Sequence, residues 1–292
     1  MLKSKKIIFV GPPGTGKTTI KKILFEKANP GELLENPLKP SRGVTSEIYT
    51  LFQSNLGVFD LAGQENNNWL SNRSKDVFNE SNIIICIFDV KTTLESIITF
   101  LIKIYEIKKD LDLKLCKIVT FIHKIDLVSL AYIERKIEAI KSFITEQHPR
   151  GREFEIYKTS IKESFLYNTF HILSSLLFSI YPKKLISLKK SEFNYLINEI
   201  NLISNMRYSS NYTFDEFFKM FDFSLEEMKF CLKNLKVLDF ITIHGDFKLI
   251  GLTERGNYFK EGLILKNSKD RESSFEKSFE ILYIFIYLYE NN

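Results

Sequence analysis

Residues 11–18 read GPPGTGKT, between an apolar run at Lys6–Val10 and a helical pattern at Lys17–Ala28. A glycine-rich turn that follows a strand and opens a helix predicts a phosphate-binding P-loop. Because prolines 12 and 13 lack N–H groups, the cradle must use donors from Gly14 onward, helped by the helix dipole. Lys17 would bring a positive charge to the β- and γ-phosphates. The predicted phosphate ligands are Gly11, Gly14, Thr15, Gly16, Lys17, Thr18 and Thr19.

This loop alone does not distinguish ATP from GTP. It resembles the loop of AAA+ ATPases, which also need an apolar strand ending in Asp-Glu. The candidate strand here ends in Phe88-Asp89-Val90 with no acid following, so Asp89 is better explained as a strand-end or capping residue. An adenine-nucleotide motor therefore stays an alternative, which competition of GDP against ADP would test.

A second motif, Asp60-Leu61-Ala62-Gly63-Gln64, ends another predicted strand downstream of the P-loop. A carboxylate in this place can hold Mg²⁺ through water, and the N–H of Gly63 can reach a γ-phosphate. Gln64 can orient the attacking water. The sequence thus predicts Gln64 and Lys17 as the catalytic residues.

A third motif, His123-Lys124-Ile125-Asp126, follows an apolar run at Lys117–His123. The Asp126 carboxylate can accept from N1–H and the 2-amino group of guanine, a pair of donors that adenine lacks. The aliphatic stem of Lys124 can lie along the base. Backbone N–H groups after the next strand can receive the guanine O6. The predicted guanine-binding residues are His123, Lys124, Asp126, Ser160 and Ile161.

The loop before the second strand should supply a further metal ligand. Ser41 and Thr45 lie nineteen and fifteen positions before Asp60, and a strand pair needs most of that length, which favours Ser41. The predicted Mg²⁺ ligands are Thr18, Ser41 and Asp60, with Thr45 as the alternative. Arg42 could act as an arginine finger in cis, but a solvated loop arginine is the simpler interpretation.

Apolar runs alternate with helical patterns along residues 1–182, which predicts an α/β domain with a mostly parallel sheet. We expect strands at 6–10, 44–51, 56–60, 83–90, 117–123 and 155–158, and helices at 17–28, 93–109, 132–146 and 165–181. Pro182-Lys183-Lys184 suggests a boundary. Residues 183–292 predict three helices, a β-hairpin at 241–252 and a helix at 253–261, the outline of a winged helix.

These motifs in this order resemble the Ras-like GTPases, and within them the Rag/Gtr branch. The resemblance covers about residues 5–181 and implies GTP and GDP binding, Mg²⁺, weak intrinsic hydrolysis, regulatory proteins, and dimers formed through the C-terminal domain. Three features depart from the family: Pro13 stands where many members have Gly, Ser41 replaces the usual Thr, and the C-terminal domain lacks strands for a roadblock fold. The stretches that are similar to the Rag/Gtr branch in particular are Phe88–Val90, His123–Val128, Lys158–Ile161 and Ser71–Asn82.

Charge bears on the choice of partners. The chain has 41 basic and 36 acidic residues, whereas residues 183–292 hold sixteen of each, so the C-terminal part is net neutral. Lys229, Lys233 and Lys236 share one face of a predicted helix that opens with Glu226 and Glu227. Duplex recognition usually needs a clear basic footprint. We therefore expect protein contacts rather than nucleic acid, with a nucleotide-gated nucleic-acid regulator as the alternative function.

Composition also bears on location. The three cysteines, Cys86, Cys116 and Cys231, lie in apolar runs without metal spacing, as expected for buried thiols in a reducing compartment. No signal peptide or span of roughly 20 apolar residues is recognisable, which predicts a cytoplasmic protein. The apolar segment Phe275–Glu290 must be buried, either by packing between the domains, in a dimer interface or against a membrane.

Overall fold

The computed structural model describes residues 3–52, 54–71, 74–147, 155–181, 190–221, 223–265 and 271–290. Two compact units account for the chain: Met1–Lys22 with Asn36–Ile161, and Ile23–Glu35 with Lys162–Asn292. The division passes through helix α1 (Lys17–Phe25), whose first six residues belong to the first unit and last three to the second. The predicted boundary at 182–184 lies outside the described residues.

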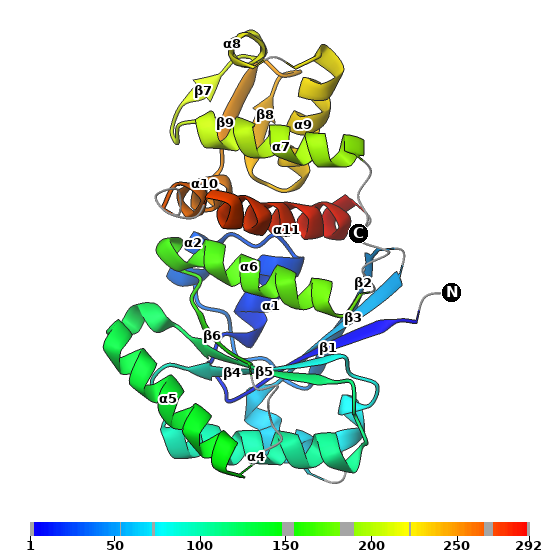
Figure 1. The fold of residues 1–292 in the computed structure, drawn as a ribbon, viewed down its shortest axis with the longest axis vertical. Helices are drawn as coiled ribbons and strands as arrows, with labels where there is room; N and C mark the ends of the chain where they lie inside the picture. The colour runs from blue at the N-terminus through cyan, green and yellow to red at the C-terminus, as the bar shows by residue number, and fades with distance from the viewer. Residues whose placement is uncertain are drawn as a thin grey trace. The chain divides into compact units, whose positions relative to one another are not determined.

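The first unit is built on a six-stranded sheet in the order β2-β3-β1-β4-β5-β6 (Figure 1). Neighbouring strands are parallel except for the hairpin of β2 and β3. This confirms the predicted mostly parallel sheet. The strands are β1 (Lys5–Val10), β2 (Val44–Leu51), β3 (Ser54–Leu61), β4 (Ile83–Asp89), β5 (Lys117–His123) and β6 (Glu155–Thr159).

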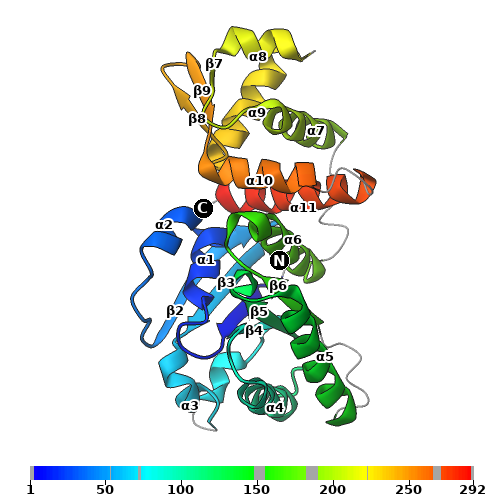
Figure 2. The same ribbon diagram turned by 90° about the vertical axis from the view of Figure 1, so that its left-hand side faces the viewer.

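Central strand β4 reads IIICIFD and is buried along its first six residues, as a strand covered on both faces must be. Helices α4 (Leu94–Asp110) and α5 (Leu130–Gln147) pack side by side over one face, and α1 lies against the other (Figures 1 and 2). Thr93 begins α4 by accepting a hydrogen bond from the Ser96 N–H at 3.3 Å. The carboxyl ends of β1, β3, β4 and β5 therefore meet at one edge, where the motifs lie.

In the second unit, α6 (Glu163–Ser179) packs against α10 (Glu254–Leu265) and α11 (Arg271–Glu290). The unit also contains α2 (Pro30–Glu35), α7 (Lys190–Asn205), α8 (Phe214–Met220) and α9 (Leu225–Val237). Capping boxes at Thr213 and Ser224 begin α8 and α9. An antiparallel sheet completes the unit in the order β7 (Asn211–Tyr212), β9 (Leu249–Leu252) and β8 (Ile241–His244).

Two sequence predictions were wrong in detail. The helix predicted to reach Ala28 ends at Phe25, and a separate helix α2 (Pro30–Glu35) follows. Asn29 causes the break, because its Oδ1 accepts from the N–H groups of Gly31 at 2.8 Å and Glu32 at 3.3 Å, and proline suits the first helical position. The short strand β7 was also missed, so the C-terminal sheet has three strands in the described residues rather than two.

The apolar C-terminal segment lies in α11, where the side chains of Ser278, residues 281–285 and residues 288–289 are buried. Phe285 lies edge-to-face on Phe170 of α6 at 5.0 Å, and Ser278 is hydrogen-bonded to Tyr167 of α6 at 2.5 Å. α11 also contacts α7, α9 and α10. Within the described part of the chain, no helix combines the length and the apolar character that crossing a membrane requires.

Candidate functional site

The P-loop runs tightly beneath β4 and β5, which explains two of its glycines. Gly11 has a φ of +148°, and a Cβ there would lie 2.1 Å from the Ile87 carbonyl oxygen. Gly16 has a φ of +96°, and a Cβ would lie 2.7 Å from Cδ2 of His123. A larger residue at either position would push the loop away from the sheet. The close approach of the loop to the sheet therefore requires glycine at both positions.

Lys17 begins α1 and is buried, with a side chain folded back over the loop. Its Nζ donates to the carbonyl oxygens of Gly11 and Pro12, both at 2.8 Å, and the residue is 6% exposed. Burial lowers the pKa of Lys17 to about 8, against the opposing effect of Asp60. A bound polyphosphate would favour the charged form, because an opposite charge stabilises an ammonium that burial destabilises.

Three oxygen-bearing side chains meet beside Lys17. Thr18 Oγ1 lies 2.5 Å from Asp60 Oδ2 and 2.9 Å from Ser41 Oγ, which brings together α1, the end of β3 and the loop before β2. Two hydroxyls and a carboxylate are hard oxygen ligands of the kind Mg²⁺ takes, so the residues fit this ion. Thr45, the alternative, is exposed in β2, in register with Asp60 of β3.

The segment after β3 closes on the P-loop. A Cβ on Gly63 would lie 2.5 Å from both the Pro12 carbonyl carbon and the Pro13 nitrogen, so only glycine fits this contact. Gln64 is exposed in the 3₁₀ turn η1 (Gly63–Glu65). The predicted catalytic pair is therefore split in this structure, with a buried Lys17 and a solvent-facing Gln64.

Two residues that the sequence did not single out tie this segment down. The Nδ2 group of Asn66, in α3 (Asn66–Trp69), donates to the Gly11 carbonyl at 3.0 Å. Glu65 Oε1 accepts from the Gly43 N–H at 2.6 Å, which joins the loop before β2 to the segment after β3. No spacing rule marks either residue, and only their position directly after Gln64 could have suggested them.

The predicted guanine residues gather beyond the ends of β5 and β6. Asp126, in the turn η3 (Ile125–Leu127), accepts at Oδ1 from Ser160 Oγ at 2.6 Å. Lys124 has a left-handed backbone with a φ of 61°, and its Nζ donates to the Gly14 carbonyl at 2.7 Å. The same Nζ pairs with Asp89 Oδ2 at 2.8 Å. Lys124 thus links the end of β5 to the P-loop and to the end of β4, and Ile161 is buried.

His123, which the sequence also predicts at the guanine site, is a buried residue. It is 2% exposed at the end of β5, and its Nδ1 lies 3.0 Å from Thr159 Oγ1 of β6. Burial, with the neighbouring Lys124 charge, lowers the pKa of His123 to about 4. The ring is therefore neutral near pH 7 and packs against Gly16 of the P-loop.

The remaining candidates take ordinary roles. Asp89 ends β4, which confirms the predicted strand-end position, and its Oδ1 accepts from the Lys91 N–H at 2.8 Å. Although burial acts to raise the pKa of Asp89, its bonds to Lys124 and Lys91 lower it overall. Arg42 is exposed. The three cysteines are free and buried, and burial raises the pKa of Cys116 to about 12.

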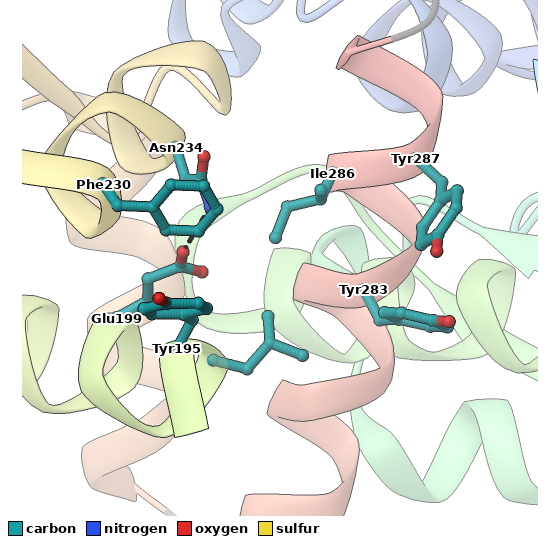
Figure 3. A pocket seen from close by; sticks show the side chains of 8 residues that line it. Tyr195, Glu199, Phe230, Asn234, Tyr283, Ile286 and Tyr287 are labelled. Carbon is teal, nitrogen blue, oxygen red and sulfur yellow. Dashed lines mark hydrogen bonds between the residues drawn. The ribbon is translucent and has the colours of Figure 1, made fainter. Parts of the chain in front are cut away.

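The second unit contains a separate cavity of about 130 Å³ between α7, α9 and α11 (Figure 3). At one side Glu199 accepts from Asn234 Nδ2 at 2.8 Å, and aromatic rings surround the rest. The cavity contains none of the residues that the motifs predict. Its lining is Tyr195, Leu196, Glu199, Phe230, Asn234, Tyr283, Ile286 and Tyr287.

Comparison with curated proteins found no match. Among solved structures, the chain is similar to a bacterial selenocysteine-specific elongation factor EF-Sec, at 19% identity and a TM-score of 0.42 over 62% of this chain and 30% of that one. It is also similar to elongation factor SelB from Methanococcus maripaludis in complex with the GTP analogue GppNHp, at 16% identity and a TM-score of 0.43 over 61% of this chain and 35% of that one. The chain thus spans about a third of those structures.

The decisive comparison is with a family model. The model of the Gtr1/RagA G protein conserved region matches residues 6–207, which is more than half of the 292-residue chain. The match includes the P-loop, the Asp60–Gln64 segment and the His123–Asp126 turn. The chain therefore belongs to the Gtr1/RagA G protein family.

Proposed function

We propose that this protein is a molecular switch that binds GTP together with Mg²⁺ and hydrolyses it slowly to GDP. The observation that carries the proposal is the meeting of Thr18, Ser41 and Asp60 beside the P-loop, with oxygen–oxygen distances of 2.5 and 2.9 Å. These groups come from three segments far apart in the chain. A cation that they share would hold the loop before β2 in place, which is the basis of a nucleotide-dependent switch.

Some protein residues would position the nucleotide and the attacking water, and others would stabilise the negative charge of the phosphates. Lys17 can leave the carbonyl oxygens of Gly11 and Pro12 to reach the β- and γ-phosphates, and the loop N–H groups from Gly14 onward supply the cradle. Mg²⁺, when bound, would neutralise charge on the phosphate oxygens. Gln64 would orient the attacking water rather than act as a strong base, and it must turn inward to do so.

We expect slow hydrolysis because, among the described residues, no arginine makes a contact at the predicted phosphate site. Arg42 is exposed on its loop, and Pro13 places a ring where the loop approaches Gly63. GTPases without an arginine at the transferring phosphate turn over slowly until a partner supplies one. We therefore propose that a regulatory protein accelerates the reaction.

The nucleotide that the purified protein carries tests this function directly. The protein should be purified without added nucleotide and then denatured. The released nucleotides should be identified by ion-exchange chromatography. We expect GDP or GTP, retained in Mg²⁺ and lost in EDTA, and a single-turnover assay should show slow Mg²⁺-dependent release of phosphate. Release of ADP or ATP would instead establish the adenine alternative.

Residues 1–182 would form the switch proper, and residues 183–292 a winged-helix-like domain used for dimerisation. Lys229, Lys233 and Lys236 are exposed on α9, but the acidic Glu226 and Glu227 open the same helix. We therefore place protein contact before nucleic-acid binding. Sedimentation should give a dimer, and filter binding at two salt concentrations should show no salt-sensitive duplex binding. The free, buried cysteines support a reducing, cytoplasmic location.

A further inference from the structure

A buried arginine of α10 lies at the far end of the P-loop helix. Arg255 is 2% exposed, and its guanidinium carbon lies 5.0 Å from the ring centre of Phe170 and 5.1 Å from that of Phe285. The rings of Phe240 and Tyr289 are 6.0 and 5.7 Å away. Aromatic faces stabilise such a cation, and a buried guanidinium also needs acceptors for its N–H groups.

One of these acceptors belongs to α1 and another to α11. Arg255 Nη1 donates to the Ile23 carbonyl at 2.9 Å, and Nη2 donates to Tyr289 Oη at 2.7 Å. The Tyr289 hydroxyl in turn donates to the Leu24 carbonyl. These two carbonyls belong to the last turn of α1, where the helix itself offers no partners. A positive charge at this end also suits the helix dipole.

The opposite end of the same helix carries the phosphate site. Lys17 and Thr18 stand in its first turn, and α1 has nine residues, so its two ends are about 13 Å apart at 1.5 Å per residue. All of the anchoring contacts lie within the second unit, which includes Ile23–Glu35. A short hydrogen-bonded helix moves as one body, so fixing its last turn restricts the first.

We propose that Arg255 and Tyr289 are positioning residues for the phosphate site, which act on it through α1. They hold the last turn of the helix so that Lys17, Thr18 and the loop before them are preorganised for nucleotide. Because coupling between sites is reciprocal, bound nucleotide should also tighten the Arg255–Tyr289 anchor. The inference rests on the nucleotide binding proposed above, and it makes the C-terminal region a determinant of nucleotide affinity.

A matched pair of tyrosines separates positioning from mere stability. Tyr289→Phe removes one hydroxyl that contacts α1. Tyr167→Phe removes another buried hydroxyl of the same unit, which is hydrogen-bonded to Ser278 of α11. Each change leaves a ring of the same size, so both full-length variants should fold with somewhat lower melting temperatures. Only Tyr289→Phe should alter nucleotide binding.

The measurement is the dissociation constant and dissociation rate of fluorescent GDP and of a fluorescent non-hydrolysable GTP analogue. We expect Tyr289→Phe to weaken binding about fivefold or more, in the usual range of coupling between sites, and Tyr167→Phe to change it less than about twofold. Arg255→Lys, which keeps the charge but not the fork of donors, should weaken binding similarly. Amide exchange at residues 23–25 should be faster in both Tyr289→Phe and Arg255→Lys.

Two results would overturn the inference. One is equal effects of Tyr289→Phe and Tyr167→Phe on affinity, which would make the anchor a source of general stability. The other is unchanged affinity in Tyr289→Phe and Arg255→Lys while amide exchange at residues 23–25 increases. If the unmodified protein bound no guanine nucleotide, the proposed function itself would be refuted, which is a distinguishable outcome.

Discussion

His123 sits behind the phosphate loop as a neutral ring, and its burial makes stability depend on pH. Its pKa is about 4 when folded, against 6.5 for an ordinary histidine. Between these values the unfolded chain binds more protons than the folded one, so the free energy of unfolding should fall as the pH drops from 6.5 toward 4. A difference of this size corresponds to roughly 3 kcal/mol at most.

The corresponding variant is His123→Asn. Urea unfolding at pH 7.5, 6.5, 5.5 and 4.5 should show a smaller loss of stability in the variant over the acid steps than in the unmodified protein. His171 on α6 is the control histidine, since its Nε2 lies 3.3 Å from Glu280 at a partly exposed site. If His171→Asn removed the acid dependence instead, the assignment to His123 would be wrong.

Asp126 should decide which base is bound. An amide in its place can donate to the 2-carbonyl of xanthine but cannot accept from both donors of guanine. Asp126→Asn should therefore lower the affinity for GDP roughly 100-fold or more and raise that for XDP, because unpaired polar groups at a base edge are costly. Competition binding measures both. Asp112→Asn, at an exposed carboxylate, is the control. Unchanged GDP selectivity in Asp126→Asn would refute the guanine assignment.

At the scale of single elements, variants in the loop before β2 should show which of its residues binds Mg²⁺. Ser41→Ala removes the hydroxyl that lies 2.9 Å from Thr18, and Thr45→Ala removes the exposed hydroxyl four residues later. We expect Ser41→Ala to raise the Mg²⁺ concentration needed for tight binding of a GTP analogue about tenfold, since one oxygen ligand is lost. Thr45→Ala should change it little. A Mg²⁺ titration in which Thr45→Ala has the larger effect would reverse the choice of ligand.

The short helix α3 carries an optical reporter of the switch. Trp69 is the only tryptophan in the chain, and its indole N–H donates to the Ala62 carbonyl at 3.0 Å, next to Gly63. If nucleotide exchange moves Gly63 off the P-loop, this bond and the half-buried ring must adjust. The emission maximum should therefore differ between the GDP form and the form with a non-hydrolysable GTP analogue. Identical spectra would argue against motion of this segment, although not against binding.

The elements that bear motifs could be predicted because each has a local signature. Strand β4 is a continuous apolar run as far as Phe88, and the positive φ angles of the P-loop turn favour its glycines. The meeting of Thr18, Ser41 and Asp60 was predictable from the order of the motifs and from the length of chain that the β2–β3 hairpin needs. Asn66 and Glu65 were not, since their partners, Gly11 and Gly43, are backbone groups that leave no pattern. The two-residue strand β7 is too short for any periodicity to show.

At the scale of the whole molecule, long-range packing determines which parts can stand alone. The alternation of strands and helices in the sequence predicts that the first domain ends at residue 182. In the structure, however, α6 packs on α10 and α11. Phe170 contacts Phe285, and Phe178 is stacked on Tyr283 at 5.8 Å. No local signal in α6 identifies these partners. This is the main feature of the fold that the sequence could not supply.

A chain cut after residue 182 should therefore be unstable. It would expose Phe170 and its buried neighbours on α6, and unpacking one large aromatic side chain costs about 3–5 kcal/mol. The melting temperature should fall by roughly 10 °C or more relative to the full chain, with aggregation on size-exclusion chromatography. Differential scanning fluorimetry in saturating GDP makes the comparison. A monomeric, equally stable fragment would show that α6 does not need these partners.

The anchor on α1 also constrains how such a protein can evolve. Arg255 and its acceptor, the Ile23 carbonyl, are 232 positions apart in the chain. Recombination that replaced everything after α6 with an unrelated sequence would remove both hydroxyl and guanidinium donors and leave the Ile23 and Leu24 carbonyls unpaired in an apolar setting. The C-terminal sequence is consequently not an interchangeable cassette, and changes in it have to be inherited together with changes at the end of the P-loop helix.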